Sequence, residues 1–223
     1  AALGGAEIIT VHLREDRRHI DDADAEALAR HLRGGVRLNL EMAATDEMVA
    51  IATRLRKEAG SPHMVTLVPE KRQELTTEGG LNASGAQARL ARTVARLHRA
   101  GVTTVSAFIT PEPRQIAAAA GAGFDACEFH TGPYARAFEA VGGDFGDPRL
   151  TGALNALANA GDAALHAAMR FHAGHALNYV NVRPVAALAG LSELHIGHAI
   201  VSRAVFTGLR AAVCEMKRLM ESA

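Results

Sequence analysis

Short runs of β-branched and aliphatic residues alternate along the chain with longer stretches in which apolar residues recur at helical spacing. The short runs predict strands, and the longer alanine-, leucine- and arginine-rich stretches predict helices. Repetition of a strand followed by a helix indicates parallel βαβ units. The predicted strands are 7–13, 36–42, 64–70, 102–110, 126–131, 170–175 and 193–197, and the predicted helices are 22–32, 45–58, 83–100, 113–120, 150–168, 181–189 and 198–220.

The length of this repeat favours an α/β fold of the TIM (β/α)₈-barrel type. The polar ends of the first and last strands, His12 and His198, lie six steps apart, so each step spans about 31 residues. A barrel of this type uses about 250 residues for eight units, which is roughly 31 each. Seven units are visible, and residues 3–6 read as the end of a helix and its turn. We therefore expect a single barrel domain over 1–223 that lacks most of its first βα unit.

An open, doubly wound sheet is the alternative architecture, but no Gly-x-Gly-x-x-Gly follows the first strand. Gly60, Gly101, Gly121 and Gly190 each follow a helical stretch and are expected to end it. The stripe Val205, Leu209, Val213, Met216 and Met220 in the last helix is expected to pack on the barrel.

Composition excludes several classes of protein. The 24 basic and 24 acidic side chains give a formal net charge of zero, which argues against binding to nucleic acid or to an anionic membrane. No apolar run approaches the roughly 18 residues of a membrane span. The first residues carry no export signal, and Cys127 and Cys214 are too few for a disulfide framework. We expect both thiols to be buried and the protein to be cytoplasmic.

Ionisable residues concentrate where the predicted strands end. In a barrel these ends form one face, and that face carries the active site. A single Glu or His at such a position is usually a solvated loop residue, but six of the seven strand ends carry one. Histidine and glutamate are therefore the candidate acids and bases. The strand-end residues are His12, Arg14, Glu41, Glu70, Glu128, His130, His175 and His198.

Glycine-bearing turns after the last two strands, 173–176 and 196–199, indicate a phosphate site, although ordinary strand-to-helix turns also use glycine. The long polar stretch 68–80 suits either a lid over the barrel mouth or a solvated loop. The glycine-rich stretch 132–155 is expected to be a second mouth-covering loop or an insertion.

Other chemistries lack their motifs. There is no His-x-His at a strand end, no His-Glu-x-x-His and no paired cysteines, so we expect no dedicated zinc site. No lysine falls within a predicted strand, which argues against a Schiff-base aldolase.

Six segments resemble the pyridoxine 5′-phosphate synthase family of vitamin B6 biosynthesis. They are 10–20, 39–43, 67–81, 128–132, 173–175 and 196–200, they follow in the family's order, and they span nearly the whole chain. The resemblance implies a (β/α)₈ barrel, usually a homo-octamer, that needs no metal or organic cofactor. The family condenses 1-deoxy-D-xylulose 5-phosphate with 3-amino-2-oxopropyl phosphate to give pyridoxine 5′-phosphate, phosphate and water.

The resemblance also implies roles for single residues. His12 and Glu41 match the family's proton acceptors, and His175 matches its proton donor. The residues that match its substrate-holding groups are Arg14, His19 and Thr76 for the deoxyxylulose phosphate, and Ala176, Gly197 and His198 for the aminoketone phosphate. Condensation, loss of water and phosphate, and ring closure all move protons at neutral pH, which several His and Glu groups serve well.

Two features depart from the family. Its first strand, with Asn-x-Asp-His, is not found in this sequence, and Ala176 stands where the family usually has glycine. These departures motivate the alternative of a non-catalytic barrel that binds a phosphorylated ligand. Another sugar-phosphate lyase or isomerase is a further alternative, but it does not account for the match through 67–81.

Overall fold

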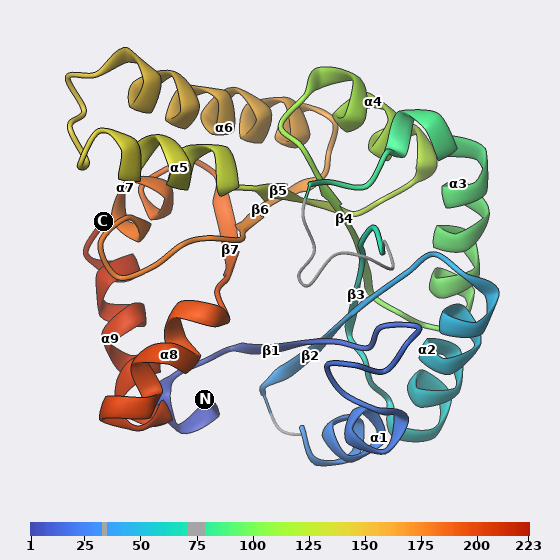
Figure 1. Cartoon of the computed structure of the whole chain (residues 1–223). Coiled ribbons are helices and arrows are strands. Elements are labelled where there is room, and N and C mark those ends of the chain that lie inside the picture. The colour runs from blue at the N-terminus through green and yellow to red at the C-terminus, as the bar shows by residue number, and fades with distance from the viewer. Residues whose placement is uncertain (33–34, 71–78) are drawn as a thin grey trace.

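Seven parallel strands form one curled sheet in the computed structural model, which describes residues 1–32, 35–70 and 79–223. The strands lie side by side in chain order, so β1 and β7 are the two edges (Figure 1). The predicted TIM-like fold with seven βα units is thus confirmed as a curled half-barrel. The strands are β1 (Ile8–His12), β2 (Arg37–Met42), β3 (Met64–Leu67), β4 (Thr104–Ile109), β5 (Ala126–His130), β6 (Arg170–Gly174) and β7 (Leu191–His195).

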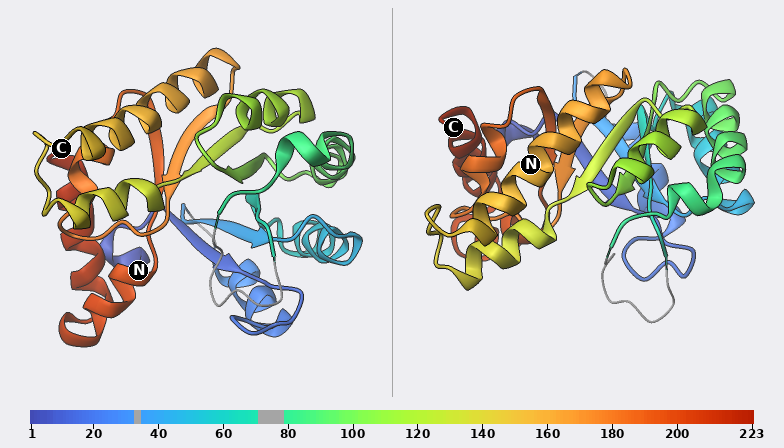
Figure 2. Two further views of the ribbon diagram at one scale, coloured as in Figure 1. Left: turned by 45° about the horizontal axis from the view of Figure 1, so that its top comes forward. Right: turned by 90° about the horizontal axis from the view of Figure 1, so that it is seen from above.

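The helices form a layer on the outer side of the curl, as the two views in Figure 2 show. The first and last elements of the chain meet, because the short 3₁₀ helix η1 packs against α9. The helical elements are η1 (Ala2–Gly4), α1 (Asp22–His31), α2 (Asp46–Ala59), α3 (Ala83–Arg99), α4 (Pro113–Ala122), α5 (Gly132–Ala140), α6 (Pro148–His166), α7 (Val182–Ala186), α8 (His198–Thr207) and α9 (Leu209–Glu221).

Alternation along the strands separates an apolar layer from a polar interior. In β2, Leu38 and Leu40 are fully buried in the hydrophobic core. Each such side chain contributes about 1.5–3 kcal/mol when it leaves water. Asn39, between them, instead joins its neighbours on β1 and β3: its Nδ2 donates to Oγ1 of Thr10, and its Oδ1 accepts from the hydroxyl of Thr66. Because side chains alternate between faces, the inside of the curl collects polar groups.

Local signals at the helix ends explain where the elements begin and stop. Asp21 and Asp24 form a reciprocal capping box at the start of α1. Thr45 accepts a hydrogen bond from the backbone N–H of Met48 at the start of α2. Gly60 ends α2 in the left-handed region with φ 69°, as the sequence predicts.

The segment 132–155 is not the loop that its glycine content predicts. It contains α5 and the first turns of α6, joined by a short connection. The prolines near the start of each helix need no partner for a backbone N–H there, so they start the helices rather than break them. Tyr134 anchors α5, because its buried hydroxyl donates to the backbone oxygen of Asn181 at 2.9 Å.

The predicted helix 198–220 is interrupted at Gly208, where φ is 79° and ψ is 149°. This conformation ends α8 and redirects the chain into α9. The predicted apolar stripe is therefore divided: Val213 and Met216 on α9 are buried, whereas Val205 on α8 is 79% exposed. Only the second half of the stripe packs on the barrel.

Two smaller predictions are also wrong. Helix α4 runs through Gly121 and ends at Gly123, which has the left-handed φ of 83° that a capping glycine provides. Cys214 is exposed on α9, whereas Cys127 is buried as expected. Burial raises the pKa of Cys127 to about 12, so this thiol is unreactive.

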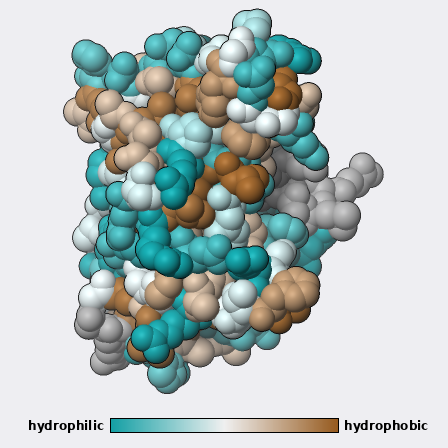
Figure 3. Space-filling model, turned by 90° about the vertical axis from the view of Figure 1, so that its left-hand side faces the viewer, coloured by the Kyte–Doolittle hydropathy of each residue, from teal (hydrophilic) through white to brown (hydrophobic). Residues whose placement is uncertain are grey.

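The surface beside the C-terminal helices carries small apolar groups between polar ones (Figure 3). Val201, Val205 and Phe206 of α8 are among the exposed large apolar side chains.

In the part of the chain that the structure describes, no helix is long and apolar enough to cross a membrane.

Candidate active site

The carboxyl ends of the parallel strands meet along one edge of the curled sheet, which we call the rim. Of the strand-end histidines and glutamates of the sequence analysis, Glu128 lies in the middle of β5 and His198 begins α8, and the others lie on this rim. The others form two groups, one on β1, β2 and the loop after β3, and one on β5 and the turn after β6.

His12 is the centre of the first group. Its Nε2 lies 3.0 Å from Oε1 of Glu70, within hydrogen-bond distance, and its Nδ1 lies 3.9 Å from Oε2 of Glu41. Glu41 stands directly beside His12 in the register of β1 and β2. Strand β3 ends at Leu67, earlier than predicted, so Glu70 reaches the group from the following loop.

The pKa values of the two carboxylates of this group are shifted in opposite directions. Burial raises the pKa of Glu41, and the neighbouring charge of His12 only partly opposes this. Burial also acts to raise the pKa of Glu70, but hydrogen bonds from His12 and from the backbone N–H of Glu15 outweigh it and leave this pKa lowered. Glu41 is therefore suited to exchange protons, whereas Glu70 stays ionised and orients His12.

Two predicted substrate-holding residues lie on the loop between β1 and α1. Arg14 is only 2% exposed, so its charge is held inside the protein. His19 is exposed, and its ring centroid lies 5.2 Å from that of His12 in an edge-on arrangement. Thr76, the third residue of this predicted set, lies outside the described residues, as do positions 71–78 of the predicted lid.

Three aromatic rings form the second group. The centroids of His130 and His175 are 5.4 Å apart, and both rings contact Phe108, at 5.5 Å and 4.8 Å respectively. Burial lowers the pKa of His130 to about 4, with further lowering by the charges of His175 and Arg136. His130 is thus neutral at pH 7 and forms part of the wall against which the ring of His175 rests.

The backbone after β6 is strained where the second group is built. His175 and Ala176 both adopt left-handed conformations, with φ of 78° and 55°. Such conformations cost about 1–3 kcal/mol in residues other than glycine and cluster at functional sites. The hydroxyl of Thr131 donates to the carbonyl oxygens of Gly174 and His175, and Asn181 donates to the carbonyl of Ala176. These bonds hold the turn on which His175 lies.

Glu128 lies behind the rim on β5 and is 2% exposed. Burial raises its pKa well above the ordinary value, and the charges of Glu41 and Glu193 raise it further. Gly174 is required opposite it, because a Cβ there would lie 2.2 Å from Oε1 of Glu128. The sequence predicts Glu128 as a strand-end acid and indicates no role for it.

The predicted aminoketone-phosphate residues Gly197 and His198 are exposed at the start of α8. The N-cap residue of this helix is Gly197, which has no side chain that could occupy the first-turn amides. A Cβ on Gly197 would meet nothing within 4 Å, so there is open space beside its backbone. Amides at a helix N-terminus with open space in front of them can hold an anion such as phosphate.

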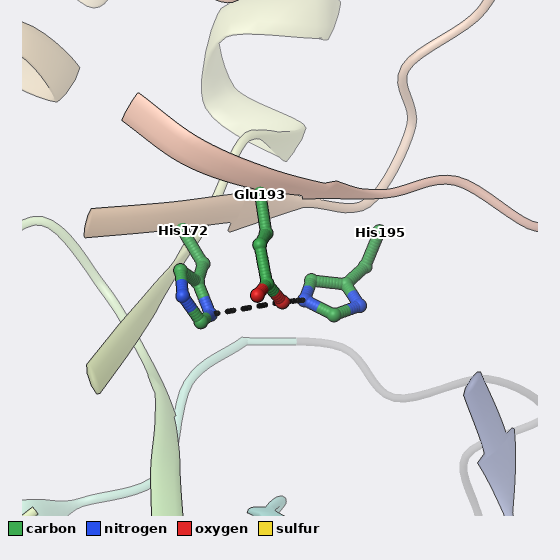
Figure 4. Close-up of side chains that lie close together, drawn as sticks. All are labelled: His172, Glu193 and His195. Atoms are coloured by element: carbon green, nitrogen blue, oxygen red, sulfur yellow. Dashed lines mark ion pairs between the residues drawn. The ribbon is translucent and has the colours of Figure 1, made fainter. Parts of the chain in front are cut away.

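A third group, which the sequence did not indicate, lies inside the curl. His172 of β6 faces Glu193 and His195 of β7 (Figure 4), and we call these three residues the inner cluster. The Glu-x-His spacing on β7 places both side chains on one face of the strand, which is the available sequence signal. A register shift between Phe171 and His172 then sets His172 beside Glu193 rather than beside Ser192.

Comparison with known proteins identifies the family. The chain matches the model of the family described as pyridoxal phosphate biosynthesis protein PdxJ over residues 1–222. It is 56% identical to a protein of Azoarcus sp. (strain BH72) and to one of Dechloromonas aromatica (strain RCB), each named pyridoxine 5′-phosphate synthase. Both alignments cover 100% of this chain and 86% of the relative.

Solved structures with low sequence identity share the fold. The BexX/CysO complex of Amycolatopsis orientalis matches with a TM-score of 0.63 at 15% identity, over 99% of this chain and 80% of that one. Phosphoribosyl anthranilate isomerase from Thermus thermophilus matches with a TM-score of 0.56 at 14% identity, over 99% and 92%. The likeness supports the barrel architecture alone. The family model and the relatives, together with the rim, place this chain in the PdxJ family of pyridoxal phosphate biosynthesis proteins.

Proposed function

We propose that this chain is a pyridoxine 5′-phosphate synthase that condenses 1-deoxy-D-xylulose 5-phosphate with 3-amino-2-oxopropyl phosphate. The products are pyridoxine 5′-phosphate, inorganic phosphate and water. The observation that carries the proposal is His12 held between Glu41 and Glu70 on the rim of a chain that belongs to this family.

In the proposed reaction His12 and Glu41 accept protons and His175 donates one. The raised pKa of Glu41 supports its role, because a carboxylate with a higher pKa is a stronger proton acceptor. Glu70 acts as a positioning residue through its hydrogen bond to Nε2 of His12. Water and phosphate leave during ring formation, and a proton donor such as His175 assists departure of a hydroxyl or phosphate group.

The substrate phosphates are proposed to bind at opposite ends of the reacting carbons. Arg14, His19 and Thr76 would hold the deoxyxylulose phosphate, and the backbone near Ala176 and Gly197, with His198, would hold the aminoketone phosphate. Exposure of Ala176 and the open space beside Gly197 support room for this second phosphate despite the added methyl group. Anchoring away from the reacting centre lets binding energy position the two molecules.

The assembly is proposed to be a homo-octamer in the cytoplasm, without nucleic-acid or membrane partners. The balanced charge of the chain supports the absence of a nucleic-acid partner. Size-exclusion chromatography with light scattering would give eight times the 23.4 kDa chain mass for an octamer. A monomer mass would overturn this part of the proposal.

The test is formation of pyridoxine 5′-phosphate from the two phosphorylated substrates, with phosphate release measured in the same reaction. We expect both products in equal amounts. Calorimetry with each substrate separates the alternative: binding of both without product would replace the synthase by a non-catalytic phosphate-binding barrel. A turnover that needs only one of the two substrates would favour a lyase or isomerase instead.

A further inference from the structure

We propose that the inner cluster binds one divalent transition-metal ion of the zinc type through His172, Glu193 and His195. These residues lie inside the curl and take no part in the proposed reaction. The proposal stands independently of the proposed reaction. It departs from the expectation of no zinc site, because the three ligands come from two strands and match no sequence motif.

The donor atoms already converge. Nδ1 of His172 lies 3.9 Å and Nε2 of His195 lies 3.7 Å from the same carboxylate oxygen, Oε2 of Glu193 (Figure 4). One donor atom from each residue lies within 4.8 Å of the other two. Ligands at about 2.0–2.1 Å from a tetrahedral zinc ion stand about 3.4 Å apart. A small inward movement of the two rings would therefore close the site.

The cluster also holds buried polar atoms that lack a hydrogen-bond partner among the described residues. Among the described residues, no hydrogen-bond partner exists for Nδ1 and Nε2 of His172, Oε2 of Glu193 or Nε2 of His195. His172 is fully buried, and buried polar atoms are nearly always paired. An ion between Nδ1 of His172, Oε2 of Glu193 and Nε2 of His195 would give three of these four atoms a partner.

Neighbouring side chains orient two of the ligands. Nδ1 of His195 lies 2.9 Å from Oγ1 of Thr10, which also accepts a hydrogen bond from Asn39. When Nδ1–H of His195 donates to Thr10, its Nε2 presents a lone pair toward Glu193. Arg37 donates to Oε1 of Glu193 at 2.9 Å and so leaves Oε2 for the ion. Supporting contacts of this kind are typical of metal-binding histidines.

The chemistry of the donors selects the ion. Mg²⁺ and Ca²⁺ require mostly oxygen ligands, usually from more than one carboxylate, but this site offers one carboxylate whose charge is shared with Arg37 and Arg170. Neutral imidazoles favour Zn²⁺ and Co²⁺.

The first experiment is a titration of the metal-free full chain with Co²⁺, followed by visible absorption. We expect one Co²⁺ per chain with the intense bands of low-coordinate cobalt, loss of these bands when Zn²⁺ is added, and no loss with Mg²⁺. Absence of the bands from the wild-type chain, or displacement of Co²⁺ by Mg²⁺, would overturn the proposal.

Variants then locate the ion. His172→Asn and His195→Asn should abolish the bands, whereas His166→Asn, which removes an exposed histidine on α6, should keep them. Thr10→Val keeps all three ligands and removes the hydrogen bond to His195, so we expect about 10–100-fold weaker Co²⁺ binding. Wild-type affinity in both histidine variants would contradict the assignment. If circular dichroism shows that these two variants do not fold, the wild-type titration and Thr10→Val decide the question.

Discussion

The rim and the inner cluster are built from the same residue types on one curled sheet, yet their surroundings are opposite. On the rim, His12 has a hydrogen-bond partner in Glu70. Inside the curl, His172 is fully buried and neither ring nitrogen has a partner among the described residues. Histidine and glutamate therefore do not define a function by themselves. What differs is the surroundings: His12 has a hydrogen-bonded carboxylate partner, whereas His172 is buried without a hydrogen-bond partner among the described residues.

Replacing His12 should have the largest effect and should separate activity from stability. We expect His12→Gln to lower turnover by about 10²–10⁴-fold, because glutamine can hydrogen-bond to Glu70 but cannot carry a proton. The melting temperature should change little. The matched control is His31→Gln, an exposed histidine on α1 that should keep wild-type turnover. Equal turnover in the two variants would remove His12 from the chemistry.

Gly174 tests the boundary between the two regions. A Cβ at this position would lie 2.2 Å from Oε1 of Glu128 and 3.0 Å from the backbone oxygen of His195. We expect Gly174→Ala to reduce the free energy of unfolding by about 1–3 kcal/mol through overpacking, as measured by urea denaturation. Gly152→Ala on α6, where a Cβ meets nothing within 4 Å, should instead add about 0.5–1 kcal/mol. Similar stabilities for the two variants would show that the barrel can relax around Glu128.

His130 predicts a smaller effect that depends on pH. Its pKa is about 4 in the folded protein, below the ordinary 6.5, so the unfolded chain binds the proton more tightly. This contribution to stability is complete above pH 6.5 and is lost as the pH falls toward 4. Between pH 7 and pH 5 we expect a loss of about 1–2 kcal/mol, allowing for solvent screening of a group that is not fully buried. In His130→Asn the free energy of unfolding should depend less steeply on pH between pH 7 and pH 5. The same pH dependence in the variant and the wild type would refute the assignment.

The sequence was sufficient for the order of strands and for most of the rim. Alternating strand and helix patterns locate the βα units, and parallel strands bring their carboxyl ends to one edge, which places His12 and Glu41 together. The prediction of a loop over 132–155 is wrong because it rests on glycine content alone, and the segment contains α5 and the start of α6. Burial of Tyr134, a contact with residues distant in sequence, holds α5 as a helix there.

The inner cluster could not be predicted from the sequence, for a different reason. His172 faces Glu193 only because the register of β6 and β7 shifts between Phe171 and His172. Such an irregularity changes which residues of the two strands lie side by side on one face of the sheet. The residue pattern of neither strand predicts it. The backbone conformation of Gly208 ends α8 and separates it from α9. A run of apolar residues at helical spacing does not reveal such a break.

The most direct test of the account is the turnover of Glu41→Gln, measured as pyridoxine 5′-phosphate formed per folded chain. Burial already disfavours the ionised form of Glu41, so the neutral glutamine should leave the melting temperature unchanged or higher. We predict at least about a 100-fold loss of turnover in this folded variant. Wild-type turnover in Glu41→Gln would contradict the claim that the rim carboxylate beside His12 moves protons in the reaction.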